Sequence, residues 1–379
     1  MQRSIEAGVG LALALLLAVG CGDSSGSGAA GSGASGPSGG GGANSQCEAE
    51  DLTACDYPSR ALTATVQEGI AITDNKTGRE LPLLARIPEG DGPLPLVVWS
   101  HGGGFNQTGH KQAAEWGKTL AEHGYVVLHI AHVPPTLDSA AALCELGSVP
   151  PADCTVDAAS DEDDNGLIAL VKTLDVIAVL DRLPQLSEAS VEAGGPAIDL
   201  DKVAVAGWSA GARAPIVTHG ARFQALPNLE PITLTHDLPR AAVALSPMGP
   251  GYAGFFDEAD GNTWEDMRAP VFMATGENDI KPSKPDVSGA DRRIAFERQP
   301  ADGQRWLLYS TLTDVGGHPS FNLEDQDSSD ERLVRLSRAL SSGVRAFLDA
   351  KLLGSAAGEA WLASDNAQTL AGEAEWVNK

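Results

Sequence analysis

From residue 61 onward, short apolar runs alternate with segments in which apolar residues recur at helical spacing. A short uninterrupted apolar run is typical of a strand that is buried on both faces, as the strands of parallel sheets are. A parallel strand also needs a crossover, usually a helix, before the next strand can pair with it. The alternation therefore predicts an α/β fold, with a mostly parallel sheet and helices on both of its faces.

The predicted elements follow one another along this part of the chain. Strands are expected over residues 61–73, 81–87, 94–99, 125–130, 202–206, 241–245, 271–274 and 305–311, the first two as antiparallel edge strands. Helices are expected over residues 111–123, 166–183, 209–220 and 331–352. Pro184 lacks a backbone N–H group, so we expect the second of these helices to end just before it.

Two segments interrupt the alternation. Residues 133–165 are Pro-rich and then acidic, and residues 249–262 are Gly-rich with three aromatic side chains. Both follow predicted strands, and ligands of parallel sheets bind beyond the carboxyl ends of the strands. Each segment is expected either to form a rim or partial lid over a site there, or to be a plain surface loop.

The first 46 residues have the composition of an export signal followed by a tether. Arg3 precedes an apolar run that is too short to span a bilayer, which indicates a signal peptide over residues 1–20. Residues 21–46 are almost entirely Gly, Ser and Ala, which cannot bury enough apolar surface to fold, so we expect a flexible linker. The folded domain is expected over residues 47–379.

The chain carries a formal net charge of −25. Such an excess of carboxylates argues against a basic surface that binds nucleic acid or an anionic membrane. The composition is compatible with a neutral or cationic small substrate, but it identifies none.

The cysteines divide into two local pairs and one that stands apart. Cys47 lies near Cys55, and Cys144 lies near Cys154. In an oxidising compartment such pairs usually form disulfides, and we expect Cys47–Cys55 and Cys144–Cys154, with cross-pairing between the groups as the alternative. Neither pair has the C-x-x-C spacing or a nearby histidine that a zinc site needs, so no metal is expected there.

The remaining cysteine, Cys21, follows the small residues Ala18, Val19 and Gly20. This stretch resembles the lipobox of bacterial lipoproteins. The resemblance implies cleavage before Cys21 and lipidation of its thiol and its new amino group. It places the mature protein on a membrane outside the cytoplasm, where the lipid is the expected membrane contact; secretion as a soluble protein is the alternative.

The sequence G-W-S-A-G follows the predicted strand over residues 202–206 and opens a predicted helix. This is the context of a nucleophile elbow, a strained strand-to-helix turn that places a serine oxygen above the sheet. The two glycines and the small Ala210 leave out side chains that would clash in such a turn. The pattern predicts Ser209 as a nucleophile.

A glycine-rich run, S-H-G-G-G, follows the predicted strand that ends at residue 99. An enzyme with a nucleophile elbow takes one oxyanion donor from this loop and another from the residue after the nucleophile. We expect the N–H groups of Gly103 and Ala210 to serve, with Gly102 or Gly104 as alternatives to Gly103. His101 is expected to order the loop.

An acid and a base are expected after two later strands. The run T-G-E-N-D ends at Asp279, which stands where an acid would hold the base in one tautomer. Glu277 is the alternative acid, whereas Asp314 lies on a different loop. His318, in G-G-H-P after the last predicted strand, is the expected base for Ser209.

Two other polar patterns are assigned lesser roles. His129 and His132 lie at a strand end near the site and are expected to be structural or to line a pocket. The acidic run that begins at Asp161 resembles the start of an EF-hand loop, but its twelfth position is Lys172 where calcium needs a carboxylate. We therefore expect a solvated acidic run and no metal.

The order H-G-G-G, G-W-S-A-G, T-G-E-N-D and G-G-H resembles that of the α/β-hydrolase superfamily over residues 62–353. The segments 94–100, 246–251, 264–270 and 318–321 are similar to a bacterial branch identified as predicted dienelactone hydrolases, and through it to platelet-activating-factor acetylhydrolases and cutinase-like serine esterases. True dienelactone hydrolases have cysteine where this chain has Ser209, which favours an esterase. Trp208, where many relatives have histidine, is expected to alter the pocket floor or helix packing without touching the chemistry.

The resemblance and the motifs together imply a serine hydrolase that cleaves a carboxylic ester through an acyl-enzyme intermediate. The expected substrate is a small-molecule or polymer ester, and no cofactor is implied. A peptidase or lactonase with the same triad is the nearest alternative. A surface-binding lipoprotein without catalysis is the alternative from another class of function.

Overall fold

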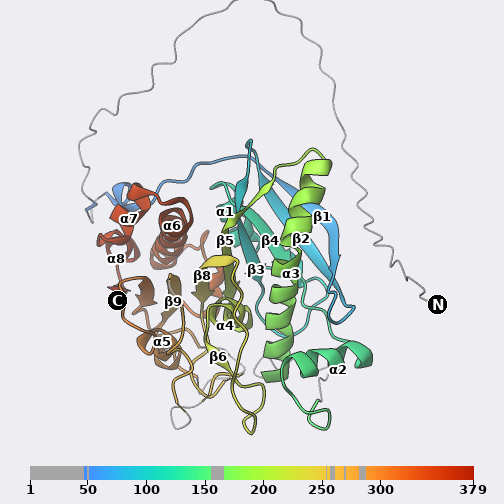
Figure 1. The fold of residues 1–379 in the computed structure, drawn as a ribbon. Helices are drawn as coiled ribbons and strands as arrows, with labels where there is room; N and C mark the ends of the chain where they lie inside the picture. Colours follow the sequence, from blue (N-terminus) through green and yellow to red (C-terminus); the bar gives the residue numbers. More distant parts are fainter. Residues whose placement is uncertain are drawn as a thin grey trace, which may run out of the picture. The chain divides into compact units, whose positions relative to one another are not determined.

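One mixed sheet of nine strands organises the part of the chain that the computed structural model describes, residues 47–48, 51–154, 166–252, 254–256, 261–268, 270–280 and 287–379 (Figure 1). The order across the sheet is β1-β2-β4-β3-β5-β8-β9-β10-β11. The strands are β1 (Ala64–Thr73), β2 (Glu80–Pro88), β3 (Leu94–Ser100), β4 (Val126–Ile130), β5 (Ile198–Trp208), β8 (Pro239–Leu245), β9 (Val271–Gly276), β10 (Arg305–Ser310) and β11 (Ala374–Asn378).

The six central strands, from β4 to β10 in this order, run parallel to one another. The edges are antiparallel: β1 pairs with β2, β2 with β4, and β11 with β10. The expected α/β class with a mostly parallel sheet is therefore confirmed. A separate two-stranded ribbon joins β6 (Arg222–Phe223) to β7 (Ile232–Thr233).

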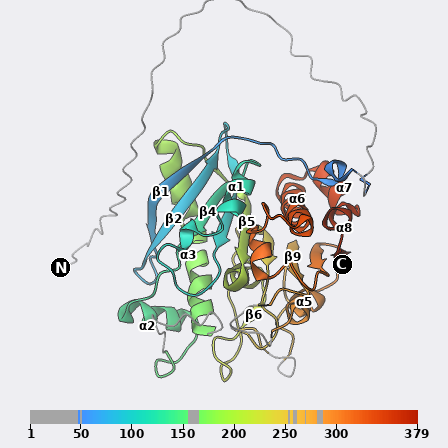
Figure 2. The same ribbon diagram turned by 180° about the vertical axis from the view of Figure 1, so that it is seen from behind.

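Helices cover both faces of the sheet, as expected. They are α1 (Ala114–Ala121), α2 (Leu137–Leu146), α3 (Gly166–Glu192), α4 (Arg213–Thr218), α5 (Gly289–Glu297), α6 (Glu331–Leu353), α7 (Ala356–Leu362) and α8 (Asn366–Ala371). Val97 and Trp99 of β3 pack in one core with residues of α1 and α6, whereas Leu96 and Val98 pack in another with α3. The alternation of side chains along the strand thus feeds two cores, and opposite views show α3 and α1 on opposite faces (Figures 1 and 2).

The prediction that helix α3 ends just before Pro184 is wrong. The helix continues through the proline to Glu192. The proline removes one backbone donor, yet the part of α3 beyond it keeps other contacts. Ser187 Oγ accepts the N–H of Ile198, and Ser190 Oγ donates to the carbonyl of Pro196. These bonds tie the end of the helix to the start of β5 and compensate for the lost bond.

The segment over residues 133–165, expected as a rim or loop, contains the helix α2. The side chain of Thr136 caps the first turn of α2 by accepting a backbone N–H group. Cys144 near the end of this helix is joined to Cys154 by a disulfide. The expected N-terminal features (the signal peptide, the linker and lipidation at Cys21) lie outside the described residues, as does the acidic run after Cys154.

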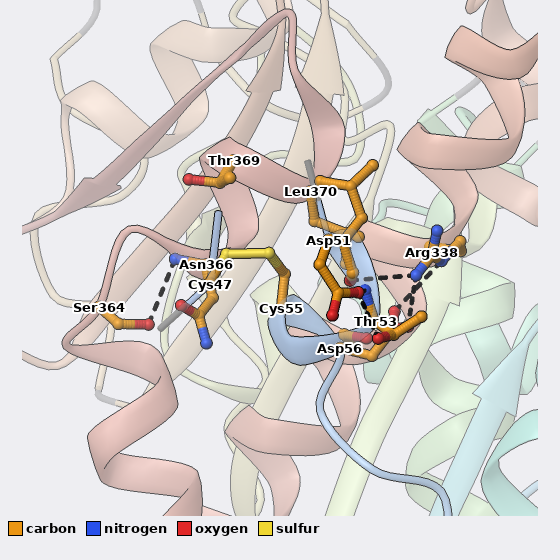
Figure 3. The surroundings of a disulfide bond; sticks show 12 residues. Cys47, Asp51, Thr53, Cys55, Asp56, Arg338, Ser364, Asn366, Thr369 and Leu370 are labelled. Atoms are coloured by element: carbon orange, nitrogen blue, oxygen red, sulfur yellow. Dashed lines mark hydrogen bonds and ion pairs between the residues drawn. A yellow bond between two sulfur atoms is a disulfide. The ribbon is translucent and has the colours of Figure 1, made fainter. Parts of the chain in front are cut away.

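A second disulfide, Cys47–Cys55, closes a short loop at the start of the unit Cys47–Lys379 (Figure 3). The loop contains the 3-10 helix η1 (Leu52–Cys55). Arg338 of α6 pairs with Asp56 at 2.6 Å and donates to the carbonyl of Leu52 at 3.1 Å. The indole N–H of Trp361 in α7 donates to the carbonyl of Cys55 at 2.8 Å. Both expected disulfides are therefore present, and this one is held against the C-terminal helices.

Segments beyond the main alternation were not anticipated from the sequence. Helices α5, α7 and α8 and strand β11 complete the C-terminal half, and β11 closes the sheet edge beside β10. A search of the described residues finds no helix long and apolar enough to cross a membrane.

Candidate functional site

A tight turn joins β5 to the 3-10 helix η3 (Ser209–Ala212), and Ser209 stands at its apex with φ of +56°. This left-handed backbone is costly for a residue with a side chain and is typical of functional turns. A Cβ atom at Gly207 would lie 2.3 Å from the carbonyl oxygen of Gly211, and one at Gly211 would lie 2.1 Å from that of Ser100. Glycine at both positions is what allows the turn to pack against the end of β3.

Ser209, His318 and Asp279 are brought together from three separate segments. Ser209 Oγ lies 2.7 Å from His318 Nε2, and His318 Nδ1 lies 2.6 Å from Asp279 Oδ1. Their exposed fractions are 2%, 6% and 0%. These three residues are called the elbow row below.

Several groups converge on the carboxyl of Asp279, at the end of the loop after β9. Ser246 Oγ and Thr275 Oγ1 donate to its Oδ2 at 2.6 and 2.7 Å, and Arg292 of α5 lies 3.4 Å from Oδ1. Burial raises the pKa of Asp279, but Arg292 and His318, together with the bond from Ser246, outweigh it and lower the pKa below its ordinary value. The side chain is therefore ionised at neutral pH.

An ionised carboxylate only accepts hydrogen bonds, so the Nδ1 atom of His318 carries the proton in this arrangement. The Nε2 atom is then free to accept the hydroxyl proton of Ser209. A serine that is hydrogen-bonded to such a histidine–aspartate pair can lose its proton as it attacks an electrophile. This is the chemistry of nucleophilic catalysis.

The two alternative acids lie elsewhere. Glu277 is exposed and bonds to Tyr309. Asp314 is exposed and pairs with Arg332 at 3.0 Å. Asp279 is the one of the three that contacts His318.

The loop that carries His318 is fixed from two sides. The indole N–H of Trp208 donates to the carbonyl of His318 at 3.2 Å, and the two rings pack with their centroids 4.9 Å apart. Asn278 Nδ2 donates to the carbonyl of Val315 at 3.1 Å. Trp208 therefore packs directly on His318, a contact that the expected role in the pocket floor or helix packing did not include.

The loop after β3, residues 101–104, lies against Ser209 and is called the glycine loop below. A Cβ atom at Gly102 would lie 3.3 Å from Ser209 Cβ and 2.5 Å from the ring of Trp208. Gly103 has φ of +70°, which favours glycine. Ala210 is buried in the first turn of η3, where backbone N–H groups have no partner within the helix. The structure thus places Gly102 of the glycine loop against Ser209 and Ala210 directly after it; the use of Gly103 and Ala210 as oxyanion donors stays a prediction.

A second row of serine, histidine and aspartate lies behind the glycine loop. Ser100 Oγ is 2.9 Å from His132 Nε2, and His132 Nδ1 is 3.0 Å from Asp175 Oδ2. Arg79 bonds to the other oxygen of Asp175. Ser100, His132 and Asp175, called the buried row below, are 0%, 0% and 2% exposed.

Burial dominates the electrostatics of the buried row. It raises the pKa of Asp175 to about 7, against the lowering effect of Arg79. Burial also holds the pKa of His132 well below its ordinary value, and the nearby Lys172 and Arg79 lower it further. His132 is therefore neutral at physiological pH.

The other histidine expected near the strand end, His129, does not belong to either row. It is 1% exposed, its ring packs 6.1 Å from that of Trp99, and burial lowers its pKa to about 3. His129 is therefore a neutral core residue.

Sequence reasoning missed the residues that support the elbow row and the glycine loop. They are Ser246, Thr275 and Arg292 around Asp279, and Lys172 and Asp175 on α3. The two α3 residues carried a usable signal, because a lysine and an aspartate three positions apart interrupt the mostly apolar first half of the helix, residues 167–180. Charged residues in a buried helix are normally paired.

No protein-family profile matches this chain, and a search of curated proteins finds no significant match.

Proposed function

We propose that this protein is a serine hydrolase with the α/β-hydrolase fold, and that it cleaves a carboxylic ester through an acyl-enzyme intermediate. The observation that carries the proposal is the continuous elbow row, in which Ser209 at a left-handed strand-to-helix turn bonds to His318 and His318 bonds to Asp279. The chain order serine, aspartate, histidine and the glycine loop after β3 support the same fold.

In the first half of the reaction, Ser209 Oγ attacks the carbonyl carbon of the ester while His318 Nε2 takes its proton. The tetrahedral intermediate then breaks its bond to the alcohol oxygen, which receives that proton from His318. In the second half, His318 takes a proton from water as the water attacks the acyl-enzyme, and returns it to Ser209 as the acid leaves.

Asp279 stabilises the imidazolium that forms in each half. Its low pKa keeps it ionised, so it holds the proton of His318 on Nδ1 and leaves Nε2 directed at Ser209. The support from Ser246, Thr275 and Arg292 fixes the carboxylate so that this geometry persists.

The N–H groups of Gly103 and Ala210 are proposed to bind the oxyanion of the tetrahedral intermediate. Donors placed in advance around a developing charge lower the barrier without reorganisation, and each contributes about 10²- to 10³-fold to the rate. No cofactor takes part in these steps. The substrate is proposed to be a small-molecule or polymer ester.

We further propose that the mature protein is exported and held at a membrane by lipid on Cys21. The disulfides Cys47–Cys55 and Cys144–Cys154 support export, because such bonds form and persist outside the reducing cytoplasm. Metabolic labelling with a radioactive fatty acid tests the anchor: wild type should incorporate label, and Cys21→Ala should not. Equal labelling of both would place the lipid elsewhere, and absence of label from both would favour soluble secretion.

The test of the hydrolase proposal combines a fluorophosphonate probe with nitrophenyl esters of increasing acyl length. Wild type should be labelled and should release nitrophenol, and Ser209→Ala should do neither. Ser341→Ala, which removes a hydroxyl from α6 that bonds to the carbonyl of Arg338, is the matched control and should behave as wild type. A folded wild type that neither labels nor hydrolyses any ester would overturn the proposal.

A further inference from the structure

The carbonyl groups of three consecutive residues in the glycine loop accept hydrogen bonds from buried side chains. Lys172 Nζ donates to the carbonyls of His101 and Gly103, each at 2.7 Å. The ring of His101 donates from Nδ1 to the carbonyl of Gly102 at 2.6 Å. Each carbonyl is thus held toward its own donor, two of them toward Lys172 and the middle one toward the imidazole of His101.

A trans peptide directs its carbonyl and the following N–H group in opposite directions. The N–H groups of Gly102 and Gly104 therefore face away from Lys172, and the N–H group of Gly103 faces away from the ring of His101. In the described part of the chain, none of these three N–H groups donates to a protein acceptor. They are available to an oxyanion beside Ser209, against which Gly102 lies.

The buried row fixes the imidazole that holds the middle carbonyl. The N–H of His132 donates to His101 Nε2 at 3.3 Å, and the rings of the two histidines lie 4.9 Å apart. Burial, with Lys172 and His132, holds the pKa of His101 well below its ordinary value, so this ring is neutral with its proton on Nδ1. Ser100 and Asp175 in turn fix the ring of His132.

Lys172 comes from α3 and is 1% exposed. A buried ammonium that donates to a carbonyl polarises the whole peptide group and strengthens its N–H as a donor. Lys172 bonds to the carbonyls of His101 and Gly103, so it polarises the peptide groups that contain the N–H of Gly102 and the N–H of Gly104.

We propose that Lys172 is a positioning residue for the hydrolysis proposed above, and that with the buried row it holds the N–H groups of the glycine loop toward the oxyanion. This inference rests on the proposed function. The oxyanion forms only in the transition state, so Lys172 acts on kcat rather than on substrate binding.

The test compares Lys172→Met with Lys351→Met. Methionine keeps much of the length of lysine and removes the charge and the donors. Lys351 is the matched control. Its side chain is also largely buried, at 8% exposed, and its contacts are with Glu359 and the ring of Trp306, away from the site. We expect Lys172→Met to lower kcat by about 10²-fold with KM within about threefold of wild type, since the loss resembles that of one oxyanion donor. Lys351→Met should keep wild-type kinetics.

A second readout separates positioning from a general loss of structure. A boronic acid binds Ser209 as a tetrahedral adduct and needs the oxyanion donors, whereas the carboxylic acid product does not form that adduct. Lys172→Met should weaken the boronate by about the same factor as kcat and leave product inhibition unchanged. Equal weakening of both ligands, or a kcat equal to that of wild type, would overturn the inference.

Ser100→Ala covers the case in which Lys172→Met does not fold. This change removes one hydroxyl from the buried row, and we expect kcat to fall about tenfold with KM unchanged, the value of one hydrogen bond. An unchanged kcat in Ser100→Ala would contradict the role of the row. A wild type that is inactive and unlabelled at Ser209 would instead remove the proposed function itself, so the two failures are distinguishable.

Discussion

Two hydrogen-bonded rows of serine, histidine and aspartate occur in the described part of the chain, and they differ in backbone, exposure and pKa. Ser209 of the elbow row stands at a left-handed turn beside a histidine that is 6% exposed. Ser100 of the buried row ends a regular strand, and its partner His132 is fully buried. The same three types of side chain therefore form the row that we propose to be reactive in one place and a fully buried hydrogen-bonded row in the other.

The two aspartates show the electrostatic side of this difference. Burial raises the pKa of both, but around Asp279 the combined effect of Arg292, His318 and Ser246 reverses the shift. At Asp175 burial prevails and the pKa rises to about 7 despite Arg79. Composition alone thus does not make a row of serine, histidine and aspartate a catalytic site. The proposed assignment of the elbow row rests on the strained turn at Ser209 and on the number of donors to Asp279.

Replacement of each histidine by alanine should separate the rows most widely. His318→Ala should lower kcat by about 10⁶-fold, as loss of a triad base does, with little change in the free energy of unfolding. His132→Ala should instead lower the free energy of unfolding by about 3 to 5 kcal/mol, because it leaves the buried hydroxyl of Ser100 and one oxygen of Asp175 without a partner. Ester kinetics and urea unfolding measure the two effects. Equal losses of kcat in both variants would contradict the distinction.

Replacement of the acid should have the next largest effect on kcat. Asp279→Asn should lower kcat by about 10⁴-fold, because the amide favours the wrong tautomer of His318. Glu277→Gln and Asp314→Asn are the controls and should stay within about twofold of wild type, since their contacts are with Tyr309 and Arg332. If either control proves as damaging as Asp279→Asn, the acid is assigned to the wrong residue.

The disulfide Cys144–Cys154 tests how the buried row is supported. It holds α2, which packs with α3, the helix that carries Lys172 and Asp175. Replacing both cysteines by serine should lower the free energy of unfolding by about 3 kcal/mol, the loop-closure contribution for a loop of this size. The rate of fluorophosphonate labelling at Ser209 should change far less. Mass spectrometry of unreduced peptides is the companion measurement, and free thiols or cross-pairs would refute the pairing.

The smallest expected effect is the pH dependence of stability from Asp175. Its folded pKa is raised from an ordinary 3.8 to about 7, so its stabilising contribution is complete below the unfolded value and is lost as pH rises through the folded one. The charged neighbours are Arg79, Lys172 and Asp74, and His132 is neutral.

The measurement is the difference in free energy of unfolding between wild type and Asp175→Asn. It should fall by about 2 kcal/mol from about pH 5 to about pH 6.5. Other carboxylates titrate equally in both proteins and cancel in the difference. Parallel curves over this interval would show that Asp175 is ionised throughout.

The sequence was sufficient for the alternating core and for the meeting of Ser209, Asp279 and His318, because strand ends in a parallel sheet converge at one edge and each residue follows a strand. It was insufficient for α2, where two prolines precede a helix whose cap at Thr136 has no strong apolar pattern behind it. The sequence also did not predict that α3 continues past Pro184. The contacts between the end of α3 and the start of β5 outweigh the tendency of proline to end a helix.

The buried row was beyond sequence reasoning for a different reason. Ser100, His132 and Asp175 lie on three segments, and their pairing depends on the register of β3 against β4 and the rotation of α3. Neither quantity is encoded in a local pattern. In the sequence, Lys172 stands out only as the twelfth residue of a run in which a calcium loop needs a carboxylate. Its contacts with the glycine loop depend on how α3 packs against that loop.

The disulfide Cys47–Cys55 determines how a pulling force would enter the folded unit. Tension applied to the chain before Cys47 passes through the sulfur bridge directly to Cys55, so the intervening residues carry little of it. From there it spreads into α6 through Arg338 and into α7 through Trp361. Strand β1, which begins only at Ala64, is an edge strand that a pull from its end would peel away one backbone bond at a time. A protein pulled from the N-terminal side of Cys47 would therefore resist at two helices before its sheet began to separate.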